Sequence, residues 1–273
     1  MLIDTHCHLN FEAFKDDLPQ VIKRAKDRGV EKIIIPGTDL ASSLCAVEIA
    51  NTYNNCWAAI GIHPHHAQDP TLEINDNLRH QLEELLTKNR VVAVGEIGLD
   101  YHTYSKTKYK QPEITNQVKH KQEQLLLMQL ELARELHLPV IFHCRDAYRE
   151  MIQTISNNSR NRENSSPPTG VFHCYGGSKQ HLSLLITMGY YIGFDGNITY
   201  SADWQQFVAA TPLERLLLET DSPFLSPIPH RDTQNEPAYL SIVAEAVARY
   251  KETPFTEVSA QTSKNAQTLF RLV

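Results

Sequence analysis

Short apolar runs alternate with amphipathic stretches along the whole chain. Eight runs have the length and character of buried strands: Leu2–His8, Lys32–Gly37, Cys56–His63, Val91–Gly98, Leu138–Arg145, Gly170–Tyr175, Tyr190–Asp195 and Leu216–Asp221. The stretches between them show helical spacing, as in Leu18–Arg28, Ala41–Tyr53, Leu78–Lys88 and Gln122–Leu136. Eight strand–helix units in strict alternation predict an α/β fold with a parallel sheet, a (β/α)8 TIM barrel.

The length of the chain fits one such barrel. It has 273 residues, and a TIM barrel typically takes about 250, so we predict a single domain over residues 1–273. Two further helical patterns, Ala238–Tyr250 and Glu257–Leu272, predict extra helices at the C-terminus. The helical patterns show no conspicuous apolar seam on their outer faces, so no obligate protein partner is expected.

Two segments interrupt the alternation. Ser156–Pro168 is polar and follows a helix, which predicts a solvated loop on the face opposite the expected active site. His102–Lys121 follows a strand and therefore opens onto the active face. It carries five lysines: Lys106, Lys108, Lys110, Lys119 and Lys121. The sequence leaves open whether this segment is a solvated loop or a contact for a polyanion.

Composition narrows the class of protein. The net charge is −6, so a general electrostatic footprint for nucleic acid is absent, although bound metal ions would attract phosphate locally. Five cysteines form no CxxC pair, which suits a reducing compartment. No apolar run reaches the roughly 18 residues of a membrane span, and no basic leader precedes the first strand. We therefore expect a cytoplasmic protein without membrane contact, and its 13 histidines need an explanation.

The candidate chemistry lies where strands end. Asp4, His6 and His8 share one face of the first strand, and two imidazoles at a strand's end can reach one metal ion. Six further nitrogen or carboxylate groups end other strands: His63, His65, Glu96, His143, His173 and Asp221. Barrel enzymes assemble their active sites at this edge of the sheet, so we predict that these groups meet.

The two-residue period of a strand predicts which side chains near its end point into the barrel and which point outward. His143 shares its face with Ile141, so Cys144 points outward. By the same argument Cys7 and Cys174 are expected between the barrel and its helices rather than as ligands or nucleophiles. Glu219 faces inward with Asp221, and Asp4 is expected to contact a ligand imidazole from behind.

Other catalytic devices have no signal in the chain. It contains no G-x-S-x-G elbow, no Walker A loop and no G-x-G-x-x-G after a strand. Hydrolysis by metal-activated water remains. Several ligands with a bridging carboxylate would allow a two-metal site, in which paired ions activate water and hold both oxygens of a phosphoester.

With these residues identified, the chain resembles the TatD family of metal-dependent deoxyribonucleases. The matching stretches are DTHCHL (Asp4–Leu9), GIHPH (Gly61–His65), GEIGLDY (Gly95–Tyr101), FHCRDA (Phe142–Ala147), FHCYGG (Phe172–Gly177), ETDSPFL (Glu219–Leu225), PHR (Pro229–Arg231) and NEP (Asn235–Pro237). They occur in order over essentially the whole chain. The resemblance implies a TIM barrel that hydrolyses phosphodiester bonds of DNA with two divalent ions, Zn, Mn or Mg.

The resemblance also implies roles for individual residues. One ion would be held by His6, His8, Glu96 and Asp221, and Glu96 would bridge to a second ion held by His143 and His173. Glu96 and Asp221 would be catalytic, with Asp221 orienting or deprotonating the attacking water. The residues that would bind substrate are His63, His65, Tyr101, Arg145 and Arg231. One departure from the family pattern is Asp232, which adds negative charge where phosphate would approach.

Three functions are compatible with this ligand set. The first is a deoxyribonuclease acting on strand ends through backbone contacts that read no sequence. The second is a metal-dependent amide or ester hydrolase on the same barrel, such as a D-aminoacyl-tRNA deacylase, because metal-activated water serves both chemistries. Many amidohydrolases use a modified lysine at strand four, where this chain has Glu96, which favours the nuclease. The third is a metal-binding scaffold without turnover.

Overall fold

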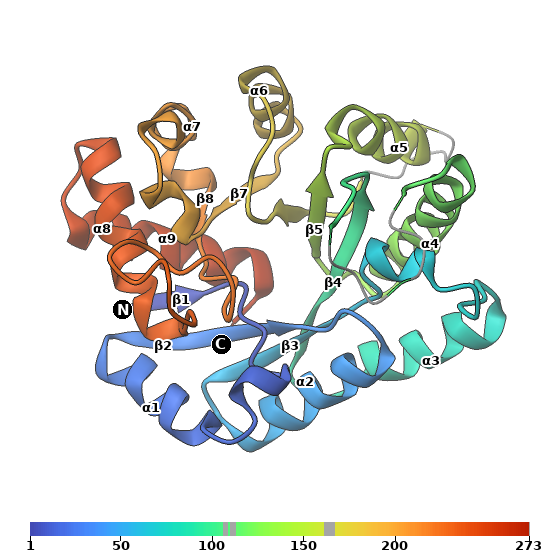
Figure 1. Ribbon diagram of the computed structural model, residues 1–273, viewed down its shortest axis with the longest axis horizontal. Coiled ribbons are helices and arrows are strands. Elements are labelled where there is room, and N and C mark those ends of the chain that lie inside the picture. The colour runs from blue at the N-terminus through green and yellow to red at the C-terminus, as the bar shows by residue number, and fades with distance from the viewer. Residues whose placement is uncertain (106–108, 110–112, 161–166, 273) are drawn as a thin grey trace.

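Eight parallel strands form one sheet in chain order. The computed structural model describes residues 1–105, 109, 113–160 and 167–272. The strands are β1 (Leu2–Asp4), β2 (Val30–Pro36), β3 (Cys56–Ile60), β4 (Val91–Asp100), β5 (Val140–Arg145), β6 (Gly170–Phe172), β7 (Tyr191–Phe194) and β8 (Leu216–Leu218). Figure 1 shows the helices arranged around these strands. The predicted TIM barrel is confirmed.

A helix follows every strand. The helices are α1 (Leu18–Asp27), α2 (Leu40–Thr52), α3 (Asp76–Leu86), α4 (Asn116–Glu135), α5 (Tyr148–Arg160), α6 (Lys179–Thr187), α7 (Gln205–Ala210), α8 (Leu240–Lys251) and α9 (Phe255–Phe270). Helix α8 completes the eighth unit, and α9 is the additional C-terminal helix. Within the described ranges, no helix has both the length and the apolar character needed to cross a membrane.

The interior of the barrel is filled by one apolar side chain from each of seven strands. These are Ile3, Ile34, Ala59, Ala93, Ile141, Val171 and Leu217. Strand β7 contributes Gly193 instead, because a side chain there would overlap the Glu219 carboxylate. Leu269 and Phe270 of α9 pack against the same interior layer. Since the candidate ligands follow the carboxyl ends of the strands, α9 closes the opposite end of the barrel.

The barrel closes through segments that lie just beyond its first and last strands. Strands β1 and β8 share no ladder, but Asp221 N donates to His6 O at 2.9 Å and His8 N donates to Ser222 O at 2.8 Å. A parallel bridge joins Cys7 to Ser222. The backbone that carries three candidate ligands is therefore also the seam of the barrel.

The lysine-rich segment differs from the prediction. Helix α4 begins at Asn116, so the last part of 102–121 is helical rather than loop. There the Lys119 ammonium lies 4.4 Å from the centre of the Tyr101 ring, and Lys121 Nζ donates to Asp69 O at 2.6 Å. Both cations are engaged with the protein. Three further lysines lie outside the described residues: Lys106, Lys108 and Lys110.

The polar segment predicted over 156–168 is partly helical. Helix α5 continues to Arg160, although serine and asparagine are poor helix formers. The preceding turns of α5 bury Met151 and Ile155, and this packing stabilises the helix against the local preference. Residues 161–166 lie outside the described part of the chain.

Candidate metal centre

Two histidines that follow β1 form the first pair of the site. His6 Nε2 lies 3.2 Å from His8 Nε2, and both side chains are buried. His8 Nδ1 faces the Pro36 carbonyl at 3.3 Å, which orients its other nitrogen into the barrel. The strand ends at Asp4, yet the alternation expected for a strand still brings both imidazoles to the same side.

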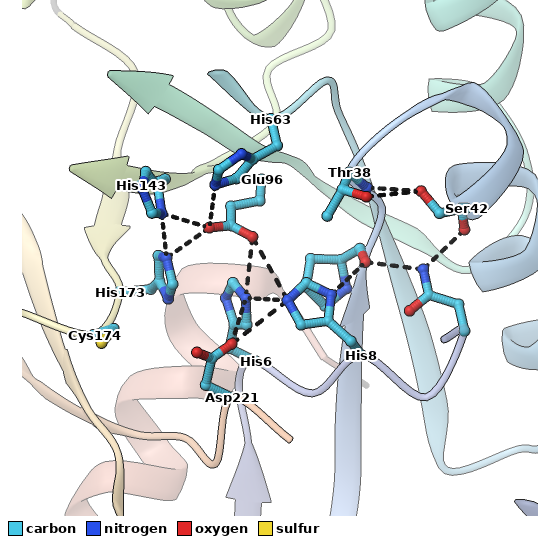
Figure 2. A network of polar contacts seen from close by, with 12 residues as sticks. His6, His8, Thr38, Ser42, His63, Glu96, His143, His173, Cys174 and Asp221 are labelled. Carbon is cyan, nitrogen blue, oxygen red and sulfur yellow. Dashed lines mark hydrogen bonds and ion pairs between the residues drawn. The ribbon is translucent and has the colours of Figure 1, made fainter. Parts of the chain in front are cut away.

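Glu96, inside β4, stands between this pair and a second one. Its Oε1 lies 2.7 Å from His173 Nε2 and 2.9 Å from His143 Nδ1. Its Oε2 lies 3.4 Å from His6 Nε2 and 3.7 Å from His8 Nε2. Each carboxylate oxygen thus faces a different pair of imidazoles, as Figure 2 shows.

Asp221 completes the first set of donors. Its Oδ1 lies 3.6 Å from His6 Nε2 and 3.5 Å from His8 Nε2. The residue adopts a left-handed backbone conformation with φ of 55°, which turns the chain sharply after β8. The side chain of Asp221 is 14% exposed, against 4% for Glu96, so water reaches Asp221 more readily.

The charges of the cluster support ionised carboxylates. Burial would raise the pKa of Glu96, but the surrounding imidazoles lower it well below its ordinary value. Burial would likewise raise the pKa of Asp221, but the hydrogen bond with His8 and the charges of the neighbouring imidazoles together lower it. Burial lowers the pKa of His6 to about 4. His143 behaves differently: burial is outweighed by hydrogen bonds to Asp100 and Glu96, which raise its pKa to about 10.

A divalent cation fits these donors. Imidazole nitrogens approach each other to 3.2 Å both between His6 and His8 and between His143 and His173. Metal ligands are typically arranged so that their donor atoms point into one buried space. Two sets of three ligand atoms, each within 4.8 Å of one another, share the carboxylate of Glu96. The donor set is therefore suited to metal at two neighbouring positions.

Comparison with known proteins agrees with this geometry. Residues 3–271 match the family described as TatD related DNase. The chain belongs to this family. It is 38% identical to an uncharacterized metal-dependent hydrolase of Bacillus subtilis strain 168, YabD, over 100% of both chains. It is 35% identical to a protein of Edwardsiella piscicida named 3'-5' ssDNA/RNA exonuclease TatD, over 99% of this chain and 100% of the relative.

A solved TatD homologue has the same architecture. The crystal structure of YJJV from Escherichia coli K12 matches with a TM-score of 0.85 and 30% identity, over 100% of this chain and 98% of that one. This TatD-family chain is accordingly a metal-dependent hydrolase of the nuclease type. The predicted family, fold and enzyme class are confirmed, and the amide or ester hydrolase is not favoured.

Sequence analysis missed one acid of the TatD-family site. Asp100, the last residue of β4, accepts a hydrogen bond from His143 Nε2 at 3.1 Å and from Tyr104 Oη at 2.7 Å. Because it holds one ring nitrogen of His143, it directs the other toward Glu96. Its signal was available: Glu96 and Asp100 are four residues apart and so share a strand face.

Asp4 and Glu219 lie behind the site, and Asp4 makes contacts other than the one expected with a ligand imidazole. Asp4 Oδ2 accepts from Thr220 Oγ1 at 2.6 Å, and Asp4 Oδ1 accepts from the His6 backbone at 3.2 Å rather than from its ring. Burial raises the pKa of Asp4 to about 7. Glu219 faces inward as predicted and accepts from the Cys174 backbone N–H. Through these hydrogen bonds both acids hold the backbone segments that carry the candidate ligands.

Two of the three cysteines beside candidate ligands point outward, as the alternation along a strand predicts. Cys7 and Cys144 are buried in the layer between the barrel and its helices. Cys174 does not join that layer, because its φ of 43° ends the alternation after β6. Its sulfur instead lies 3.5 Å from Asn197 Nδ2. Burial raises the pKa of all three thiols well above the ordinary value, so none is prepared to act as a thiolate.

The histidines expected to meet substrate occupy different depths. Residue His63 lies in the cluster itself, with Nε2 3.5 Å from Glu96 Oε1 and its ring 4.2 Å from that of His143. The ring of His65 lies farther out, 5.4 Å from that of Tyr104, and His65 Nδ1 pairs with Gln68 Nε2 at 3.0 Å.

The arginines and tyrosines at the mouth divide into two pairs. The Arg145 guanidinium lies 5.1 Å from the centre of the Tyr104 ring and donates to its hydroxyl at 3.2 Å. Arg231 lies 4.3 Å from the centre of the Tyr200 ring. Both arginines are exposed, so both remain available to phosphate.

The Tyr101 side chain, a predicted substrate contact, lies on the helix side of β4, and its role toward substrate stays a prediction. Its ring packs against the outer core and under Lys119, and the acids that raise its pKa after burial are Glu150 and Glu123, on α5 and α4. One residue after Asp100, it points to the helix layer instead of the site. The hydroxyl of Tyr104, by contrast, contacts Asp100 and Arg145.

The NEP stretch (Asn235–Pro237) has a structural role in this TatD-family chain. Asn235 is fully buried, and its Nδ2 donates to Thr220 O at 2.8 Å and to Phe224 O at 2.6 Å. These two carbonyls lie on either side of Asp221. Asn235 therefore clamps the turn that presents this carboxylate.

Replacing Asn235 with alanine should lower the free energy of unfolding by about 3 kcal/mol, because buried carbonyls lose their donors. Urea denaturation followed by circular dichroism measures this change. Asn51→Ala is the matched control, since Asn51 is exposed on α2 and should change stability by less than about 0.5 kcal/mol. Equal stability of the two variants would contradict the role of the clamp.

Proposed function

We propose that this chain is a two-metal deoxyribonuclease that removes nucleotides from the end of a single DNA strand. The observation that carries the proposal is the position of Glu96, whose two oxygens face two separate pairs of imidazoles. A carboxylate so placed is suited to bridge two ions. His6, His8 and Asp221 would complete the first position; His143 and His173 would complete the second.

The residues have separate tasks in this proposal. Divalent ions held by these residues would supply an activated water and neutralise the charge of a phosphodiester. Asp221, ionised and partly exposed, orients the attacking water and accepts its proton. Arg145 and Arg231 hold the backbone phosphates at the mouth without contacting the bases. Asp100 keeps the His143 ring in the orientation that directs its other nitrogen toward Glu96.

The relatives support the choice of substrate. A protein 35% identical to this chain is named a 3'-5' ssDNA/RNA exonuclease, which agrees with a polynucleotide end as substrate. The net charge of −6 implies few backbone contacts and weak binding that is lost as salt rises. The donors favour Zn or Mn over Mg, because imidazole-rich sites bind these ions more strongly.

Removal and return of metal tests the proposal. Dialysis against a chelator should abolish cleavage of a labelled single-stranded oligonucleotide, and Mn²⁺, Zn²⁺ or Mg²⁺ added singly should restore it to different degrees. Elemental analysis of the restored protein should give two ions per chain. An RNA strand and an aminoacyl ester are assayed in parallel. Cleavage of the ester with none of DNA would reject the proposal, and full activity with one ion would reject its two-metal form.

A further inference from the structure

Two phenylalanines beside the site are not explained by packing. The Phe224 side chain is 51% exposed, and Phe11 is half-buried. Neither ring belongs to the buried core nor to the partly buried side chains packed against it. An aromatic ring held at the surface carries unburied apolar area, and beside a catalytic centre this points to a ligand that covers it.

The two rings extend from a ligand histidine to the surface. Phe11 stacks on His8 with ring centres 4.4 Å apart and planes 16° apart. Phe224 stands edge-on to Phe11, with ring centres 6.1 Å apart and planes at 75°. The centre of the Phe224 ring is 6.4 Å from that of His8. Together the rings form an aromatic corner next to the metal centre.

The backbone holds this corner in place. Phe224 N donates to Asp221 O at 2.9 Å, and Phe224 O accepts from Asn235 Nδ2 at 2.6 Å. Phe11 N donates to His8 O at 3.0 Å. The backbone that carries each ring is thus hydrogen-bonded to the segments that carry the proposed ligands, so covering the rings requires little additional ordering of the backbone.

We propose that Phe224 and Phe11 form a stacking platform for the base of the nucleotide next to the scissile bond. The inference rests on the proposed nuclease function and adds how a strand is selected. Every base offers a flat π face, so stacking tolerates any sequence. Only a sugar separates a base from its phosphate, and a base on Phe224 therefore brings its phosphate to the imidazole–carboxylate cluster.

The platform selects single strands. In a duplex both faces of an internal base are covered by its neighbours, so the base has no face free for Phe224. A single strand, or an end that has frayed, exposes that face. Selection by stacking needs no basic surface, which agrees with a chain whose net charge is −6.

An abasic substrate isolates the stacking contact. Two single-stranded oligonucleotides are compared, one intact and one with an abasic residue beside the terminal nucleotide. In the wild type, the abasic residue should lower kcat/KM roughly tenfold. Phe224→Ala should lower kcat/KM on the intact strand by a similar factor and remove the difference between the strands. Phe224→Tyr should keep the difference, and Phe255→Ala, at an exposed phenylalanine of α9, should behave as wild type.

A binding measurement separates stacking from catalysis. In a Glu96→Gln background, fluorescence anisotropy of the two labelled strands should show the same tenfold difference in Kd, lost on adding Phe224→Ala. If Phe224→Ala weakens both strands equally, or neither, the platform is rejected while the nuclease stands. A wild type that cleaves no polynucleotide rejects the proposed function and the platform with it.

Discussion

Replacing Glu96 with glutamine is expected to lower kcat/KM for single-stranded DNA by about a thousandfold. The amide keeps the shape of the side chain but removes the charge that faces both imidazole pairs. Loss of one bridging ligand costs several kcal/mol of transition-state stabilisation, and about 4 kcal/mol corresponds to three powers of ten. Steady-state cleavage of a labelled oligonucleotide measures the change.

The same variant should also bind less metal. Elemental analysis is expected to fall from two ions per chain to one or fewer, while circular dichroism stays that of the wild type. Glu245→Gln is the matched control, because Glu245 is exposed on α8 and should retain full activity and metal. A Glu96→Gln enzyme with two ions and normal turnover would show that the carboxylate does not bridge.

Asp221→Asn should lower kcat by about 10²–10⁴-fold with a much smaller change in KM, as removal of a proton acceptor does. The pKa of Asp221 lies below its ordinary value, so its carboxylate is ionised at neutral pH and ready to take a proton. Steady-state kinetics at saturating metal separates kcat from KM. A variant that loses only affinity for metal, and regains wild-type kcat when metal is raised, would make Asp221 a ligand and not a base.

The fold and most of the arrangement of the candidate ligands could be predicted because side chains alternate regularly along a strand. Alternation places His143 inward with Ile141 and Cys144 outward, and the structure has both arrangements. Parallel strands carry their carboxyl ends to one edge. The sequence therefore predicts that residues far apart in the chain, such as His6 and Glu96, lie close together.

The errors arise where the regular geometry ends. Strand β4 runs two residues past its expected end at Gly98, so Asp100 was overlooked. After β4 the chain leaves the strand geometry, and the Tyr104 hydroxyl turns back to contact Asp100. The positive φ of Cys174 reverses a side chain that alternation places elsewhere. The positions of Tyr104 and Cys174 depend on backbone turns, about which periodicity holds no information, whereas the same alternation continued to Asp100 would have identified that acid.

The seam of the barrel has a consequence for synthesis of the enzyme. His6 and His8 leave the ribosome long before β8, but Asp221 and the backbone that pairs with them follow β8. Until that last strand has emerged and docked, the first pair of histidines lacks both its carboxylate and its neighbouring strand. An unfinished chain therefore cannot bring these donors together, and on the proposed function a nascent chain would stay inert toward nucleic acid until β8 has docked.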